Sequence, residues 1–203
     1  MGLTIDVLNL GDITGDWSFT VRGRIPGVTV TVPANAFLIR GGEKPILVDA
    51  GTRNTDVLTR VGMLPIEDPE TTLEAQLARF DLTAGDIGAV IQTHLHVDHA
   101  GRLDAFPMST PVIVNRRELM FAYSGIQGLF YAPEDLAHLL ERIYTPGALG
   151  ILDLELTGAV EVFPGIRCEA SLGHTNGRKS SNRRAEGRSE WPFRPNDSGI
   201  RSA

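Results

Sequence analysis

The stretch THLHVDHAG, from Thr93 to Gly101, decides the fold of this chain. It gathers His94, His96, Asp98 and His99, which include three of the five histidines of the chain, into six residues. Residues two positions apart in an extended chain point the same way, so His94 and His96 converge at the end of a strand. Asp98 and His99 follow where the chain turns toward a helix, and they can face a second point nearby. Because burying such groups without partners costs too much free energy, and because imidazole and carboxylate bind zinc-like divalent ions, the stretch predicts a metal site.

The flanking sequence predicts short strands in meanders, with helices in separate blocks. The expected strands are Val28–Pro33, Ala36–Gly41, Lys44–Gly51, Ile87–Gln92, Thr110–Asn115 and three more within Ile151–His174. The expected helices are Thr71–Leu82, Arg116–Tyr123 and Pro133–Ile143. The first three strands are expected to follow one another in antiparallel order. This organisation favours an α/β fold with two mostly antiparallel sheets flanked by helices, rather than a strictly alternating parallel fold.

The pattern ends at Gly177. Residues 178–203 are rich in Arg, Ser, Gly, Asn and Pro, and they show neither strand nor helix periodicity. They hold seven Lys or Arg against three Asp or Glu, whereas residues 1–177 hold 12 against 22. We therefore expect a folded domain over 1–177 and a basic, disordered tail over 178–203.

Composition narrows the classes of function. The chain has 203 residues, 42% of them hydrophobic and 22% charged, which is ordinary for a soluble globular protein. The acidic body argues against a nucleic-acid partner. The sequence contains no pattern typical of a signal peptide or of a transmembrane span, so no membrane partner is expected. Cys168 is the single cysteine, which suits a cytoplasmic location.

Three segments carry a resemblance to a known family. THLHVDHAG resembles the HxHxDH signature of the metallo-β-lactamase superfamily. The segment NAFLIRGGEKPILVDAG (Asn35–Gly51) is similar to the early hairpin of that family, and GHT (Gly173–Thr175) is similar to its next histidine motif. Within the superfamily, LTAGDIGAVIQTHLHVDHAGRLDAFP (Leu82–Pro107) and the VIVNRREL that follows are most similar to N-acyl-homoserine lactonases, which quench bacterial quorum sensing. The resemblance spans about residues 5–177.

This resemblance implies a fold, a ligand set and a reaction. The fold would be the αββα sandwich of the superfamily. His94, His96 and His174 would bind one metal ion, and Asp98 and His99 a second, with Zn²⁺ as the expected cofactor. Hydroxide generated at the metals would open the lactone ring of a small-molecule substrate. Asp98 would also act as a catalytic residue by orienting the water.

The chain also departs from the family pattern. The family completes its site with a bridging aspartate and a later histidine, and lactonases add a tyrosine, but here no histidine follows His174 and no tyrosine follows Tyr144. Asp197 is the only aspartate beyond Gly177, and it lies in a polar segment unlike the strand that precedes the bridging aspartate in the family. We expect a chain that is truncated or frameshifted after about Gly177, with an incomplete second half, about one metal ion per chain and impaired activity.

Three functions stay open at this point. The first is the opening of N-acyl-homoserine lactones. The second is thioester hydrolysis of the glyoxalase II kind, which shares the metal motif. The third is a non-catalytic, metal-binding fragment.

For three further residues the sequence leaves two roles open, one at the predicted site and one structural. Asp49 either accepts a hydrogen bond from a ligand imidazole or caps the turn before Gly51. Phe130 and Tyr131 either line an apolar pocket for an acyl chain or belong to the core, and the core is favoured.

The remaining candidates are expected to be structural. His138 is interpreted as a surface or boundary histidine, because no partner lies at metal-ligand spacing. Cys168 is interpreted as a small core residue. Arg116 and Glu118 are interpreted as solvated charges on a helix.

Overall fold

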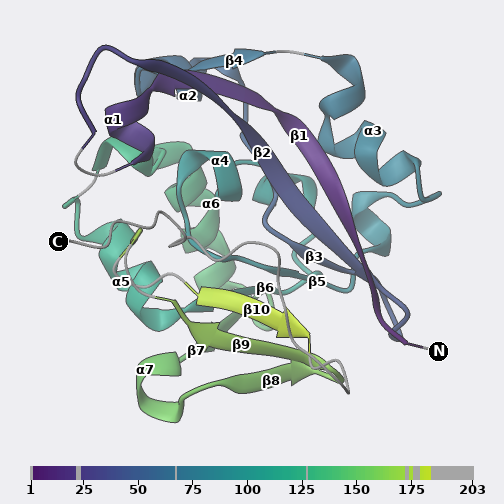
Figure 1. The fold of residues 1–203 in the computed structure, drawn as a ribbon. Helices are drawn as coiled ribbons and strands as arrows, with labels where there is room; N and C mark the ends of the chain where they lie inside the picture. The colour runs from purple at the N-terminus through teal and green to yellow at the C-terminus, as the bar shows by residue number, and fades with distance from the viewer. Residues whose placement is uncertain are drawn as a thin grey trace, which may run out of the picture.

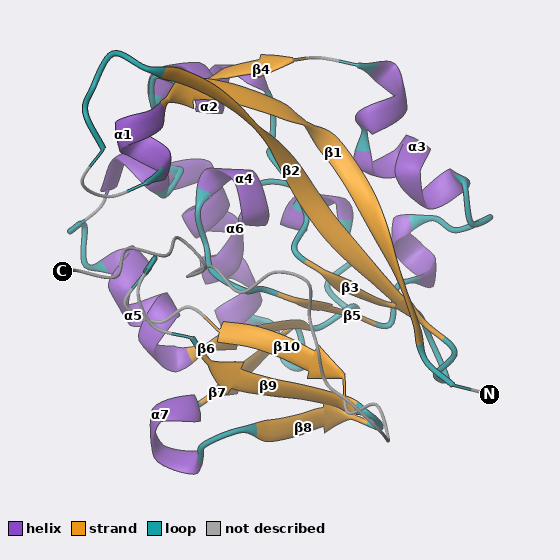
Figure 2. Ribbon diagram, in the orientation of Figure 1, coloured by secondary structure: helices purple, strands orange, loops and turns teal. Residues whose placement is uncertain are grey.

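The computed structural model describes residues 2–21, 24–66, 68–126, 128–171, 174–175 and 179–183 (Figure 2). Its strands are β1 (Thr4–Asp16), β2 (Thr29–Arg40), β3 (Ile46–Val48), β4 (Leu64–Ile66), β5 (Ala89–Ile91), β6 (Val112–Asn115), β7 (Leu149–Leu152), β8 (Val160–Phe163), β9 (Ile166–Ala170) and β10 (Lys179–Arg183). Its α-helices are α1 (Trp17–Thr20), α2 (Thr55–Arg60), α3 (Leu73–Ala78), α4 (Val97–Ala100), α5 (Arg116–Tyr123), α6 (Pro133–Tyr144) and α7 (Leu154–Thr157). Every helix within these ranges is too short or too polar to cross a membrane.

The strands of this part of the chain form two sheets. The larger has the order β4-β1-β2-β3-β5-β6-β7, and the smaller has the order β10-β9-β8 (Figure 1). The pairs from β4 to β3 are antiparallel, whereas β3, β5, β6 and β7 pair in parallel. The smaller sheet is antiparallel throughout. The central parallel strands all end at one edge of the sheet, which is where the predicted metal motif follows β5.

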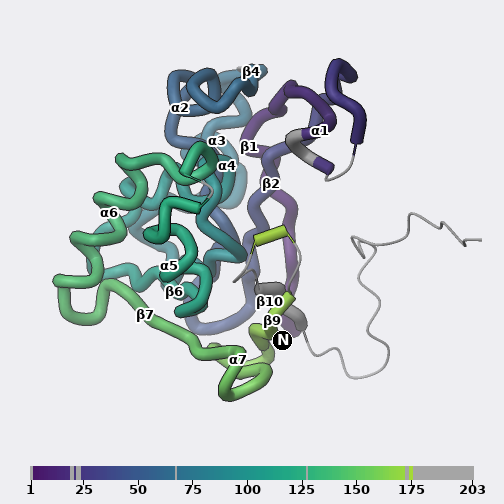
Figure 3. The backbone as a smooth tube through the Cα atoms, turned by 90° about the vertical axis from the view of Figure 1, so that its left-hand side faces the viewer, coloured from purple at the N-terminus to yellow at the C-terminus, as the bar shows by residue number. Residues whose placement is uncertain are grey.

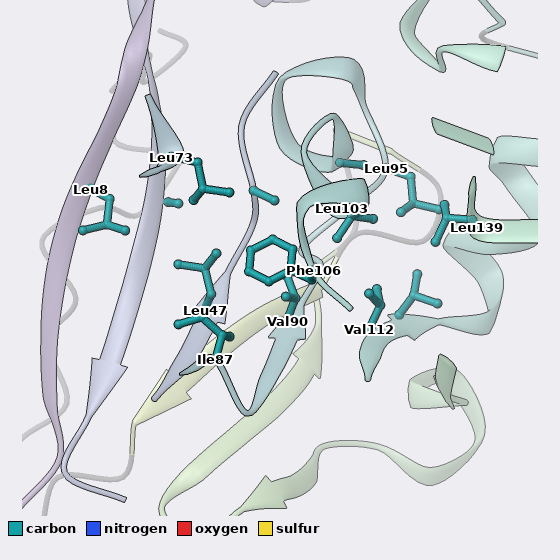
Figure 4. Packing of buried hydrophobic residues seen from close by; sticks show 14 of the residues in the cluster. Leu8, Leu47, Leu73, Ile87, Val90, Leu95, Leu103, Phe106, Val112 and Leu139 are labelled. Carbon is teal, nitrogen blue, oxygen red and sulfur yellow. The ribbon is translucent and has the colours of Figure 1, made fainter. Parts of the chain in front are cut away.

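Helices cover one face of the larger sheet. Successive residues of a strand point to opposite faces, so Leu47, Val90 and Val112 share the face toward the helices. There they belong to one buried cluster with Phe106, which follows α4, and Leu139 of α6 (Figure 4). Figure 3 shows α2 to α6 on one side of strands β1 and β2.

The smaller sheet covers the other face. Ile46 and Ile91 point away from the helices and lie in a second cluster with Leu154, Ile166 and Cys168. Cys168 is fully buried, as predicted for a small core residue. Helices, large sheet and small sheet are three successive layers of the predicted αββα sandwich, so the predicted fold class is confirmed. The larger sheet is mixed, however, and not mostly antiparallel as predicted.

The N-terminal half departs from the predicted strand order. Val28–Pro33 and Ala36–Gly41 were expected to be separate strands, but they belong to the single strand β2, which pairs along most of β1. Pro33 lies opposite Asp12, beside an irregularity in the register of β1, and bulges of this kind are places where a sheet accepts proline. The strand β1 was not predicted, since its polar residues and Gly11 mask the alternation.

The C-terminal part also departs from prediction. Part of the expected strand at the start of Ile151–His174 forms the short helix α7. Disorder was expected for 178–203, but Lys179–Arg183 forms β10 and pairs antiparallel with β9. This pairing uses backbone N–H and C=O groups, so it does not require alternating apolar side chains. Asp197 lies outside the described residues.

Candidate metal centre

The motif Thr93–Gly101 leaves the end of a buried strand. All three residues of β5 are buried, and the chain then passes through His94 and His96 before α4 begins. His96 is the N-cap of α4 and keeps extended backbone angles, with φ −65° and ψ 158°. The histidine side chains are 1% and 6% exposed, respectively. The loop therefore holds two imidazoles in the interior instead of in solvent.

The structure brings the five predicted ligands together in two groups. His94, His96 and His174 form one group, and His94, Asp98 and His99 form the other; within each group the ligand atoms lie within 4.8 Å of one another. The His174 Nε2 atom lies 3.2 Å from His96 Nδ1, although 78 residues separate them in sequence. The prediction assigned only Asp98 and His99 to the second group, whereas in the structure His94 belongs to both groups.

Asp49 supports this centre from the end of β3. Its φ of 62° is in the left-handed region, which turns the carboxylate toward the motif. One oxygen accepts the Thr93 N–H at 2.8 Å, and the other accepts the Thr93 hydroxyl at 2.7 Å and pairs with His99 Nδ1 at 2.8 Å. Of the two roles open for Asp49, the structure has the first, a contact with a ligand imidazole.

These contacts set the tautomers of two ligands. The Thr93 hydroxyl has one proton and donates it to Asp49, so its oxygen accepts from His94 Nδ1 at 3.0 Å. His99 likewise donates its Nδ1 proton to Asp49. When each imidazole is neutral, its Nε2 lone pair is left for a metal ion.

Asp98 and His99 form a coupled pair without metal. Burial alone lowers the pKa of His99, but the carboxylates of Asp98 and Asp49 outweigh it and raise this pKa to about 10. Burial raises the pKa of Asp98, and the His99 and His96 imidazoles hold it well below its ordinary value. Binding of a metal ion needs the neutral imidazole of His99, so it would be coupled to loss of this proton.

Close backbone packing joins the turn after β3 to α4. The Ala50 N–H donates to the His99 carbonyl at 2.7 Å, and the Gly101 N–H donates to the Gly51 carbonyl at 2.8 Å. A Cβ atom on Gly101 would lie 2.1 Å from the Arg53 nitrogen, so only glycine fits there. This contact fixes Asp49 against the motif that it supports.

The predictions for the neighbouring aromatic residues have mixed outcomes. Tyr131 is 2% exposed and lies in the core, as favoured, with its ring centroid 5.0 Å from that of His96. Phe130 is only half-buried, and its ring lies 5.4 Å from that of His96. Phe130 is therefore an apolar residue beside the metal centre.

Glu118 corrects a prediction. It was expected to be a solvated helix charge, but it is completely buried and accepts a hydrogen bond from the Leu95 N–H, between His94 and His96. The signal was present in the sequence, because Glu118 lies four residues before the buried Ala122 on the same face of α5.

The other charged candidates are as predicted. Arg116 is half-exposed and pairs with Asp153. His138 is a boundary residue whose Nε2 accepts from Arg142 Nε at 2.9 Å. Burial, and then the Arg142 charge, lowers the pKa of His138, which keeps it neutral as this bond requires.

The donor sets fit a zinc-like divalent ion. Three imidazoles, or two imidazoles with a carboxylate, are the protein ligands of zinc sites that keep one position open for reaction. A separate open cavity of about 590 Å³ adjoins the turn after Asp49, where Arg53 and Arg102 line it, and it contains none of the five ligands. The potential metal ligands therefore lie outside the lining of this cavity.

Comparison with known families gives an independent result. The family described as the Metallo-beta-lactamase superfamily matches residues 29–177. An N-acyl homoserine lactonase from a Bacillus species is 30% identical over 164 residues, covering 76% of this chain and 60% of the relative. N-acyl homoserine lactonase AiiA of Bacillus thuringiensis subsp. kurstaki is 30% identical over 165 residues, with the same coverage. The chain thus spans about 60% of the length of these curated relatives.

Solved structures agree with the fold. An N-acyl homoserine lactone hydrolase, with the product N-hexanoyl-L-homoserine bound at its catalytic metal centre, has a TM-score of 0.73 at 26% identity. The match covers 92% of this chain and 72% of that one. The dizinc quorum-quenching lactonase AidC has a TM-score of 0.66 at 18% identity, covering 91% and 68% of the two chains, and it supports the fold alone.

Proposed function

The chain belongs to the metallo-beta-lactamase superfamily, and from this premise we propose that it is a metal-dependent hydrolase that opens the lactone ring of N-acyl homoserine lactones. One observation carries the proposal: His94 lies with His96 and His174 in one group of potential ligands and with Asp98 and His99 in another, and the ligand atoms of each group lie within 4.8 Å of one another. The 30% identity to curated lactonases supports this substrate class. The proposed hydrolase domain is residues 1–177 together with β10, which pairs with β9 in the smaller sheet, and the proposed location is the cytoplasm.

Each ligand has a proposed role. His94, His96 and His174 would hold one Zn²⁺ ion, and Asp98 and His99 would contribute to a second position. When bound, such ions supply hydroxide near neutral pH and polarise an ester carbonyl. The Asp98 carboxylate, 29% exposed, accepts a hydrogen bond from the attacking water and orients it. Phe130, beside His96, offers apolar surface to the substrate.

The proposal is tested with the full chain, stripped of metal and reloaded with Zn²⁺. Opening of N-hexanoyl-homoserine lactone produces an acid, which a pH indicator follows continuously. We expect hydrolysis that depends on Zn²⁺ and that His96→Ala abolishes. His138→Gln is the matched control, because glutamine keeps an acceptor for Arg142 at a histidine outside the centre.

The same preparation separates the alternatives. Release of thiol from S-lactoylglutathione, without lactone opening, would identify a thioesterase of the glyoxalase II kind. Zinc binding without hydrolysis of any ester or thioester would identify a non-catalytic metal-binding fragment. Either result would overturn the lactonase proposal.

A further inference from the structure

Glu118 is a buried carboxylate that joins three separate segments. Its Oε1 accepts from the Leu95 N–H at 3.0 Å and from the Tyr131 hydroxyl at 3.0 Å. Its Oε2 accepts from the Thr175 hydroxyl at 2.6 Å. Glu118 is 0% exposed, and Thr175 and Tyr131 are 4% and 2% exposed, so water does not compete for these bonds.

Each partner of Glu118 is adjacent to a proposed metal ligand. Leu95 lies between His94 and His96, and Thr175 follows His174. Tyr131 packs edge-on against the His96 ring, with the two ring planes at 71°. The Glu118 side chain therefore binds residues that lie next to His94, His96 and His174, either in the sequence or in space.

The hydrogen-bond acceptors of a carboxylate match this position. It has only acceptor sites, and its neighbours here are an N–H and two hydroxyls, which all donate. Burial and the Glu118 charge raise the pKa of Tyr131, so this hydroxyl keeps its proton and stays a donor. In the described ranges Glu118 makes no ion pair, so its interactions are directional hydrogen bonds to neutral groups.

We propose that Glu118 is a positioning residue of the metal centre, which sets His174 in register with His94 and His96. The segment that carries His174 comes from beyond β9, whereas the other two histidines follow β5. Thr175 and Leu95 bind opposite oxygens of one carboxylate, so its width fixes the spacing between the segments. This inference rests on the proposed metal centre and assigns Glu118 no contact with substrate.

The test compares zinc affinity among the wild type, Glu118→Ala and Glu118→Gln, measured by competition with a chromophoric chelator. Glutamine keeps an oxygen for Leu95 and Tyr131, and its amide can donate to the Thr175 oxygen, so we expect affinity close to wild type. Alanine leaves all three donors without an acceptor, so we expect affinity about ten- to a hundredfold weaker. The visible spectrum of the Co²⁺-loaded protein should change with alanine and not with glutamine.

Gln76→Ala is the matched control. Gln76 of α3 is also buried, and its side-chain amide donates to the Glu70 carbonyl at 2.7 Å and accepts from Arg79 at 2.8 Å, so these hydrogen bonds involve neither a proposed ligand nor a partner of Glu118. We expect it to lower the melting temperature without changing zinc affinity. If Glu118→Ala does not fold, Thr175→Val and Thr175→Ser test the same link, with affinity lost for valine and retained for serine.

Several outcomes would overturn the inference. Equal zinc affinity in the wild type and folded Glu118→Ala would exclude a positioning role. So would an equal loss of zinc affinity in Gln76→Ala, or a loss in Glu118→Gln as large as in Glu118→Ala. A wild-type protein that binds no zinc would overturn both this inference and the proposed function, whereas the other results concern Glu118 alone.

Discussion

At the scale of single residues, the centre depends on side chains that do not bind metal themselves. Asp49 fixes the Nδ1 side of His99 directly and that of His94 through Thr93, which directs the Nε2 atoms toward a shared space. Sequence spacing predicts the ligands because each motif is local. It cannot predict the contact of Thr93 with Asp49, since 44 residues separate the two and only the sheet brings them together.

Asp98 is expected to contribute more to turnover than to metal retention. Asp98→Asn keeps the size of the side chain but removes the charge that orients water. We expect kcat to fall by about two orders of magnitude or more, with a smaller fall in zinc bound per chain. Steady-state kinetics and elemental analysis of the same samples check this. Equal losses of kcat and zinc would show that Asp98 acts only as a ligand.

Asp135 is expected to make stability depend on pH. It is 2% exposed; burial raises its pKa to about 6, although Arg53 donates to it at 2.7 Å and opposes the shift. Because the folded protein holds this proton more tightly than the unfolded chain, whose Asp pKa is 3.8, stability falls as pH rises from about 4 to about 6. Two pKa units correspond to about 3 kcal/mol.

Asp135→Asn should remove the fall in stability with rising pH. The free energy of unfolding, measured in urea at several pH values, checks this. Glu134→Gln is the control, because Glu134 is the adjacent carboxylate, its pKa is lowered, and its contribution has the opposite sign. Parallel pH profiles for the wild type and Asp135→Asn would show that Asp135 does not titrate in this range.

At the scale of elements, the centre depends on how a strand end meets a short helix. The turn after β3 and the C-terminal end of α4 share two backbone hydrogen bonds, and glycine allows their close approach. The sequence predicts β3, β5 and β6 because their apolar runs are continuous. It divides β2 wrongly, since Pro33 and Asn35 resemble turn residues although the partner strand β1 holds them in an extended conformation.

Gly101→Ala is expected to disturb this junction. The added Cβ would lie 2.1 Å from a backbone nitrogen, so the turn that carries Asp49 must move. We expect a loss of stability of at least about 1–3 kcal/mol together with weaker zinc binding. Thermal unfolding and chelator competition measure the two effects. Gly85→Ala is the control, because its nearest neighbour would be an ordinary contact at 3.6 Å, and equal behaviour of the two variants would contradict the prediction.

At the scale of the whole molecule, one buried arginine connects the helix layer to the segments that lead into the central strands β6 and β7. Arg142 of α6 is 0% exposed and donates to the carbonyls of Leu103, Phe106 and Thr110, which lie between α4 and β6. A longer contact reaches Ala148, just before β7. Sequence alone gives no sign of this, because an arginine in an amphipathic helix is ordinarily exposed.

Arg142→Met is expected to destabilise the whole domain. It keeps much of the apolar stem but removes the arginine donor from the carbonyls of Phe106 and Thr110, at a cost of about 1–3 kcal/mol each, whereas the Leu103 carbonyl still accepts from the Phe106 N–H. We expect the midpoint of urea unfolding to fall accordingly. Arg60→Met, at a half-exposed arginine with one ion pair to Glu134, should change stability by less than about 1 kcal/mol. Similar midpoints for the two variants would refute the assignment of Arg142 as a connecting residue.

The membership of His94 in both ligand groups has a consequence for partial metal loading. Thr93 occupies its Nδ1, so His94 has one coordinating atom and serves one ion at a time. A chain that bound a single ion would therefore have two possible positional isomers, one with the ion near His174 and one with it near His99, and the two would compete for His94. Substitutions that weaken either group shift this isomer ratio, so a spectrum of the half-loaded protein reports on the balance between the two groups.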